Sequence, residues 1–136
     1  MAHYSGHCLC QAVSYHFDCE PISAVHCHCS DCQKATGSGF ATVFSVPEAA
    51  ISISGQEHLT AFAVQAPSGK RVQRSFCKIC GSPLFTHAES NPGYIWIKAG
   101  SLTESSWLKP QIACWTGSAA SWAPAIDNIP QFQGNP

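Results

Sequence analysis

Apolar residues occur along this chain in short runs rather than in long periodic stretches. Seven runs are rich in β-branched and aromatic residues and are bounded by turn residues, which favours β-strands. They are Ala12–Phe17, Ile22–His26, Phe40–Val46, Ala50–Ser54, Leu59–Gln65, Arg71–Phe76 and Tyr94–Lys98. No window of eleven or more residues carries apolar positions at helical spacing. Only one short helical turn is therefore expected, over Ser30–Ala35 with Ser30 or Asp31 as its N-cap. The pattern predicts a mainly β fold.

The chain has 136 residues, the length of one ordinary domain. No internal repeat and no low-complexity tract divides it. We therefore expect a single domain over residues 1–136, large enough to bury its own core. Residues 103–136 are expected to run as an extended segment packed on that domain.

Charged residues are scarce and balanced. They make up 11% of the chain, with seven Lys and Arg against eight Asp and Glu. Without a surplus of cations we expect no nucleic-acid partner and no binding to an anionic membrane surface. No apolar run approaches the roughly 20 residues of a membrane-spanning helix. Residues 1–10 lack the regions of a signal peptide, so we expect a cytoplasmic protein.

Cysteine is the unusual residue of this chain. There are nine, an odd number that cannot all form disulfides within one chain. Seven fall in three clusters, Cys8-Leu9-Cys10, Cys27-His28-Cys29-Ser30-Asp31-Cys32 and Cys77-Lys78-Ile79-Cys80. Clustered cysteines in a protein that is not exported point to metal or thiol chemistry. The remaining two, Cys19 and Cys114, are isolated and are interpreted as small buried apolar side chains.

The two cysteine pairs have the spacing of a closed zinc site. Structural zinc takes four ligands in a tetrahedron. A C-x-C pair in extended chain places both side chains on one face. Gly81 follows the C-x-x-C pair and allows a tight turn beneath a metal. We therefore expect a structural zinc on Cys8, Cys10, Cys77 and Cys80. It would act as a staple, because metal-binding free energy becomes folding free energy.

The remaining cluster has three sulfurs, and these are Cys27, Cys29 and Cys32. Three protein ligands leave one coordination position for water or substrate, as in catalytic zinc sites. We therefore expect a second zinc here, whose free position suits an incoming thiolate. A fourth ligand from His26, His28 or Cys19 would instead close the site and make it structural.

Four stretches together resemble one known family. They are GHCLC at residues 6–10, CHCSDCQKATGSGF at 27–40, RSFCKICGSPL at 74–84 and GSL at 100–102. In order and spacing they resemble the glutathione-dependent formaldehyde-activating enzyme family, which also includes centromere protein V. The resemblance covers about residues 6–102, and more loosely 122–132.

The resemblance implies a β-tent of antiparallel sheets and two zinc ions per chain. The implied structural zinc lies on Cys8, Cys10, Cys77 and Cys80, and the second zinc on Cys27, Cys29 and Cys32. The implied activity is that of a carbon–sulfur lyase acting on a small-thiol/aldehyde adduct of the S-hydroxymethylglutathione type. The partners would be a small thiol such as glutathione and an aldehyde. Two features depart from the family: Gln11 stands where Gly is common, and the chain is short.

Several points remain open from the sequence. The Thr36–Gly39 loop could admit substrate to the backbone or could simply form a turn. Candidates for binding substrate carboxylates are Lys34, Arg71, Arg74 and Lys78, although solvated surface positions are the commoner role.

Two other functions deserve weight. One is a non-catalytic zinc module that binds a protein partner or acts as a chaperone, because a fold alone does not decide function. The other is an enzyme like methionine sulfoxide reductase B, which would use Cys114 as its reactive thiol.

Overall fold

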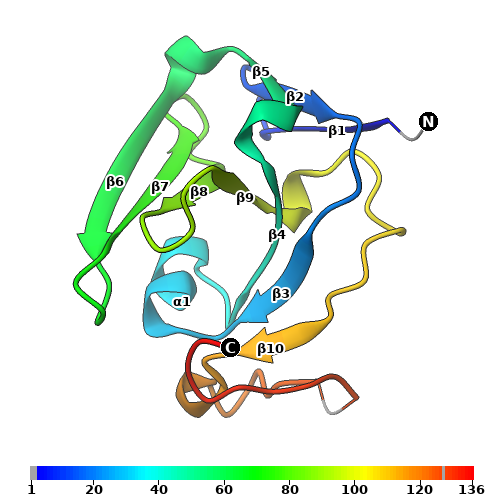
Figure 1. Cartoon of the computed structure of the whole chain (residues 1–136). Coiled ribbons are helices and arrows are strands. Elements are labelled where there is room, and N and C mark those ends of the chain that lie inside the picture. Colours follow the sequence, from blue (N-terminus) through cyan, green and yellow to red (C-terminus); the bar gives the residue numbers. More distant parts are fainter. Residues whose placement is uncertain (1–2, 127) are drawn as a thin grey trace.

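Two β-sheets form the body of the protein in the computed structural model, which describes residues 3–126 and 128–136 (Figure 1). The smaller sheet has the order β1-β2-β5. Its strands are β1 (Tyr4–His7), β2 (Ser14–Phe17) and β5 (Ile51–Ser54). The larger sheet has the order β10-β3-β4-β9-β8-β7-β6. Its strands are β10 (Ile112–Cys114), β3 (Ser23–Cys27), β4 (Ala41–Pro47), β9 (Tyr94–Lys98), β8 (Pro83–Ala88), β7 (Arg71–Cys77) and β6 (Leu59–Gln65).

The expectation of a mainly β fold is confirmed, with one difference in strand direction. All neighbours within the two sheets pair antiparallel except β10, which pairs parallel with β3. The pattern located seven of these strands to within about two residues and missed β1, β8 and β10. The larger sheet is therefore mixed rather than purely antiparallel.

Helical structure in the described residues is short. The α-helix α1 (Ser30–Thr36) lies where the sequence predicted a helical turn. Its N-cap is Cys29 rather than Ser30 or Asp31, because the Cys29 sulfur accepts the N–H of Cys32 at 3.2 Å. Four 3₁₀-helices complete the set, η1 (Glu48–Ala50), η2 (Gln56–His58), η3 (Ala99–Ser101) and η4 (Thr116–Ser118). No helix in the described part of the chain is long and apolar enough to cross a membrane.

The two faces of the larger sheet have different roles. One face packs on the smaller sheet, where the Phe17 and Phe44 rings lie 5.7 Å apart and the Tyr15 and Phe85 rings 5.5 Å apart. The opposite face carries a second apolar cluster, built from Val25, Ala41, Val43 and Cys114. Cys27 and Cys32 pack against this second cluster. The smaller sheet thus covers the face of the larger sheet that forms the main core. The opposite face of the larger sheet carries Cys27 and Cys32.

Within residues 103–136, the stretch that follows β10 returns to pair with that strand. The N–H of Ala113 donates to the carbonyl of Pro130 at 3.0 Å, and the N–H of Phe132 donates to the carbonyl of Ala113 at 2.9 Å. Figure 1 shows the C-terminus close to β10, on the side of the molecule away from β1. Residue 127, within this segment, lies outside the described residues.

Gly6 in β1 provides a test of how tightly the smaller sheet is packed. A Cβ atom at Gly6 would overlap the Tyr15 hydroxyl and the Ser101 carbonyl, whereas one at Gly100 would meet nothing within 4 Å. Gly6→Ala should therefore lower the free energy of unfolding by about 1–3 kcal/mol through overpacking. Gly100→Ala, the matched control, should change it by less than about 0.5 kcal/mol. Urea unfolding of both variants with excess zinc would measure this, and equal effects would contradict it.

Candidate metal and thiol sites

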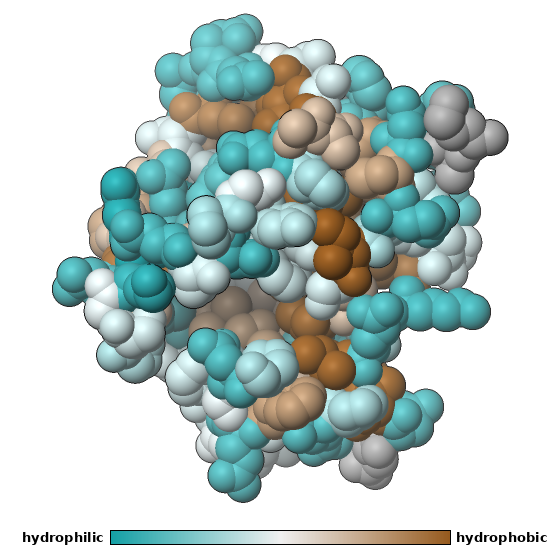
Figure 2. All heavy atoms as spheres, viewed as in Figure 1, coloured by the Kyte–Doolittle hydropathy of each residue, from teal (hydrophilic) through white to brown (hydrophobic). Residues whose placement is uncertain are grey.

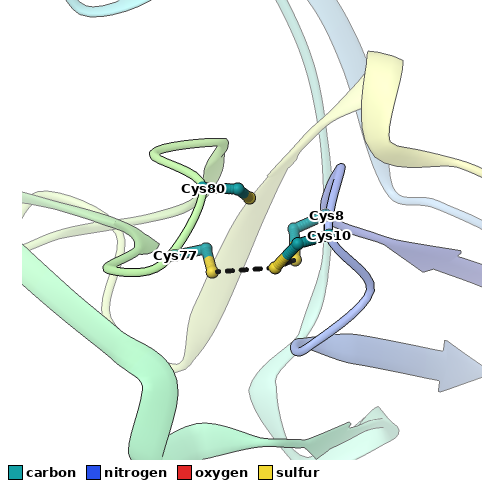
Figure 3. Close-up of side chains that lie close together, drawn as sticks. All are labelled: Cys8, Cys10, Cys77 and Cys80. Atoms are coloured by element: carbon teal, nitrogen blue, oxygen red, sulfur yellow. Dashed lines mark hydrogen bonds between the residues drawn. The ribbon is translucent and has the colours of Figure 1, made fainter.

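The two distant cysteine pairs meet in one cluster. The Cys10 sulfur lies 3.7 Å from the sulfur of Cys8 and 3.7 Å from that of Cys77. All four sulfurs, including that of Cys80, lie within 4.8 Å of one another. Figure 3 shows the loop that follows β1 and the loop that follows β7 presenting their cysteines toward one another. The cluster therefore joins the smaller sheet to the larger one.

Tight turns aim these sulfurs inward. The N–H of Gly81 donates to the carbonyl of Cys77 at 2.7 Å, and Gly81 has a φ of +79° that suits glycine. In the other loop the N–H of Gln11 donates to the carbonyl of Cys8 at 3.0 Å, and Gln11 has a φ of +66°. Gln11 thus adopts a left-handed conformation that glycine would adopt without strain. This geometry explains why glycine would suit the position.

Ser82 connects the two loops. Its hydroxyl accepts the N–H of Leu9 at 3.1 Å and lies 3.2 Å from the Cys80 sulfur. This hydrogen bond is the main reason that the pKa of the Cys80 thiol falls to about 5. At Cys10 the backbone acts to lower the pKa, but burial and the neighbouring sulfurs raise it to about 11. The cluster therefore holds one readily ionised thiol beside one that keeps its proton.

The four-sulfur cluster fits a tetrahedral zinc ion. Zinc–sulfur bonds of about 2.3 Å in a regular tetrahedron place neighbouring sulfurs about 3.8 Å apart. The two measured separations of 3.7 Å agree with that edge length. An all-sulfur donor set is typical of structural zinc sites.

The second cluster gathers where β3 runs into α1. Cys27 ends β3, Cys29 precedes α1 and Cys32 lies in its first turn. Their sulfurs lie within 4.8 Å of one another. Among the described residues neither His26, His28 nor Cys19 joins this group. Three sulfurs fit a metal ion with one position left for another ligand.

The pKa values of all three thiols are raised. At Cys27 the leading cause is the adjacent Cys114 sulfur, and at Cys32 it is the Cys27 sulfur. At Cys29 the hydrogen bond with Cys27 acts to lower the pKa, but Cys32 and burial outweigh it. Without a metal these thiols keep their protons at neutral pH. A bound zinc ion would have to displace those protons.

Nothing in the sequence indicated that Cys114 lies beside this cluster. It pairs directly with Cys27 in the parallel β10–β3 register, so both side chains emerge on the same face of the sheet. Cys114 is buried, as expected for an isolated cysteine. Its burial beside Cys27 also leaves it poorly placed to act as an accessible reactive thiol.

The histidines near the cluster have other partners. His28 is fully buried, and its ring lies 5.0 Å from that of Phe40. Nδ1 of His26 lies 2.8 Å from the Thr42 hydroxyl, across the β3–β4 pair.

Two cations approach the three-sulfur cluster from the larger sheet. Nη2 of Arg74 in β7 lies 4.0 Å from the Cys32 sulfur. Lys98 at the end of β9 is buried, and this burial lowers the pKa of its ammonium group although the sulfurs of the three-cysteine cluster act to raise it. Of the four cations singled out from the sequence, Lys34, Arg71 and Lys78 are exposed and Arg74 is half-buried. Lys98 was missed because the end of an apolar strand gives no sign that its lysine is buried.

The Thr36–Gly39 loop meets the C-terminal segment. Gly37 ends α1 with a φ of +71°, and a Cβ at Gly39 would overlap Ala123 and press on Trp122. Nearby, the side-chain amide of Gln33 donates to the carbonyls of His28 and Ser118, both at 2.9 Å. The loop therefore packs against the chain's own C-terminal segment. Figure 2, viewed as Figure 1, shows the surface hollowed beside α1.

Comparison with known proteins supports one family. A model of the family described as "Glutathione-dependent formaldehyde-activating enzyme" matches residues 3–118. An uncharacterized lyase of Schizosaccharomyces pombe is 33% identical over 85 residues, covering 62% of this chain and 58% of that protein. A Penicillium rubens protein, described as a candidate glutathione-dependent formaldehyde-activating enzyme, is 28% identical over 115 residues, covering 82% of this chain and 59% of that protein. The chain thus spans less than two thirds of either relative.

A solved structure shares the fold. The crystal structure of a Rhodobacter sphaeroides protein superposes with a TM-score of 0.59 at 23% sequence identity. The match covers 78% of this chain and 91% of that one.

Acid should remove metal from the three-sulfur cluster before the four-sulfur cluster. The raised pKa values of its thiols mean that protons compete with zinc up to a higher pH, and it offers one fewer sulfur. Zinc affinity should fall by up to about tenfold per pH unit for each proton that rebinds. Zinc release measured with an indicator dye from pH 7.5 downward should occur in two steps. Cys32→Ser should abolish the step at higher pH, and loss of the other step would contradict the assignment.

The two left-handed turn residues should respond oppositely to substitution. Gln11→Gly removes a strained side-chain position, so it should raise the free energy of unfolding by about 0.5–1 kcal/mol. Gly81→Ala places a Cβ at a φ of +79° and should lower it by about 1 kcal/mol. Thermal unfolding with excess zinc would measure both variants. Shifts of the same sign would contradict the explanation from backbone conformation.

Proposed function

This chain belongs to the glutathione-dependent formaldehyde-activating enzyme family, and we propose that it is a zinc-dependent carbon–sulfur lyase acting on a thiol/aldehyde adduct. The adduct is of the S-hydroxymethylglutathione type. It forms reversibly from glutathione, as the small thiol, and formaldehyde, as the aldehyde. The family match and the lyase and enzyme names of the two relatives support this proposal.

The observation that carries the proposal is the three-sulfur cluster at the junction of β3 and α1. Cys27, Cys29 and Cys32 would hold a zinc ion, and the position left free would accept the substrate sulfur. Zinc bound there would keep a small thiol in its thiolate form at neutral pH. The four-sulfur cluster would hold the second zinc as a staple between the sheets.

The reaction needs a positioned thiolate and a carbonyl carbon. In the condensing direction the thiolate sulfur forms a bond to the carbonyl carbon, and the electron pair of the C=O bond moves to oxygen. The proton lost by the thiol ends on that oxygen and gives the hydroxymethyl product. In the lyase direction each change is reversed. The chain's own residues contribute by holding the sulfur in place, which converts an encounter of two molecules into a local step.

Native mass spectrometry of the reduced chain tests the binding part of the proposal. Two zinc ions per chain and a glutathione adduct are expected for the unaltered chain. Cys29→Ser should lose one zinc ion and the adduct, whereas Cys19→Ser, outside both clusters, should keep them. Turnover is tested by NMR. The experiment follows exchange of the one-carbon unit, through its CH₂ signal, between formaldehyde hydrate and the glutathione adduct.

The rate of this exchange should fall at least about 100-fold in Cys29→Ser, since metal-site variants cost 10–100-fold even outside the ligands. Unchanged turnover in Cys29→Ser would contradict the lyase mechanism. Two zinc ions with neither adduct nor exchange would favour a non-catalytic zinc module instead.

A further inference from the structure

Arg74 and Lys98 flank one threonine on the face of the larger sheet that carries the three-sulfur cluster. Arg74 in β7 pairs with Thr86 in β8, and Thr86 pairs with Trp96 in β9. Lys98 follows two residues after Trp96, so both project from the same side of β9. Nζ of Lys98 donates to the Thr86 hydroxyl at 3.0 Å. Three adjacent strands therefore place the two cations on one face of the sheet, on either side of Thr86.

Neither cation has an acidic partner in the described residues. The ion pairs found there each join a histidine to a carboxylate. Lys98 is only 8% exposed, and Nε of Arg74 is buried with no hydrogen-bond partner. A buried cation is costly unless an anion or several acceptors face it. An ammonium group has three donors, and the Thr86 hydroxyl accounts for one.

Both cations lie on the face of the larger sheet that carries the three-sulfur cluster. Nη2 of Arg74 is 4.0 Å from the Cys32 sulfur, a separation that leaves this contact weak. Lys98 pairs across the sheet with Val43, which belongs to the apolar cluster that Cys27 and Cys32 pack against. Donors with unused capacity therefore lie beside the sulfurs that would hold the zinc ion and, through it, the substrate sulfur. The carbonyl oxygen of an aldehyde bonded to that sulfur would lie only one carbon atom away.

We propose that Arg74 and Lys98 form an oxyanion site that binds the aldehyde-derived oxygen of the adduct. This inference rests on the proposed function. As the carbon–sulfur bond forms, the C=O electron pair moves onto oxygen, and the guanidinium and ammonium groups donate hydrogen bonds to it. The proton released by the thiol then neutralises that oxygen. Donors aimed at a developing oxyanion stabilise the transition state more than the ground state.

An alternative role would be to balance the charge of the metal–thiolate centre itself. The two roles predict different losses. A charge-balancing pair would change zinc content and thiol binding, whereas an oxyanion site would change the rate of the chemical step. Zinc stoichiometry, thiol binding and the separation of kcat from KM therefore distinguish them.

Two test variants, one conservative variant and one matched control test the proposal. Arg74→Gln and Lys98→Met each remove one positive charge, and Lys70→Met removes one from the exposed turn before β7. Zinc per chain and the glutathione adduct are measured by native mass spectrometry, and kcat and KM by the NMR exchange rate. Lys98→Arg serves as the conservative variant, because it keeps a cation at a buried position.

The expected result is a loss of kcat of about 10²–10³-fold in Arg74→Gln and Lys98→Met. Two zinc ions and the glutathione adduct should be retained, KM for glutathione should stay within about threefold, and Lys98→Arg should recover part of the rate. Lys70→Met should match the unaltered chain. If Lys98→Met does not fold, the half-buried Arg74→Gln decides alone.

Two results would overturn the oxyanion site while leaving the proposed function intact. One is a kcat in both variants within about threefold of the control. The other is a parallel loss of zinc or thiol binding, which would assign the pair to charge balance. If the unaltered chain neither binds glutathione nor exchanges formaldehyde, the proposed function fails and the oxyanion site fails with it.

Discussion

The meeting of Cys8 and Cys10 with Cys77 and Cys80 joins the smaller sheet to the larger one beside the main core. The smaller sheet has three strands, and its aromatic residues cover only one face of the larger sheet. The cysteine cluster joins the loop between β1 and β2 to the loop between β7 and β8. The register of β7 against β8 and of β8 against β9 places Arg74, Thr86 and Trp96 on the opposite face of the larger sheet. The three-sulfur cluster and its cations occupy that opposite face.

Alternation of side chains along the strands gives the larger sheet two different faces. One face packs in the main core, and the other carries the three-sulfur cluster and its cations. In β9, Ile95 and Ile97 enter the main core, while Trp96 and Lys98 face the other way. In β7 the same alternation turns Arg74 toward Cys32. A single-residue shift of register would exchange the two sets, placing cations in the apolar core. Burial of the isoleucines therefore also holds Lys98 on the sulfur-bearing face.

The spacing of residues predicted those parts of the fold and of the candidate site that depend on neighbours in sequence. It did not predict contacts between residues on strands distant in sequence. Cys27, Cys29 and Cys32 meet because a strand end and the first turn of a helix lie within six residues. The mainly β class followed from short runs of β-branched and aromatic residues without helical periodicity, and α1 was predicted from the capping residues near its start. β8 escaped notice because it begins at Pro83 and carries polar residues, yet pairing on both sides maintains it. Lys98 and Cys114 could not be placed near the cysteines without the register of strands distant in sequence.

The two cysteine clusters differ in how much chain must exist before they can form. A chain emerging from the ribosome presents Cys27, Cys29 and Cys32 almost together. Cys10, by contrast, must wait for Cys77, 67 residues later. Closing that long loop also costs more chain entropy than closing the short one. During synthesis the three thiols therefore face the cell's metal ions and small thiols before the two sheets of the protein have been joined.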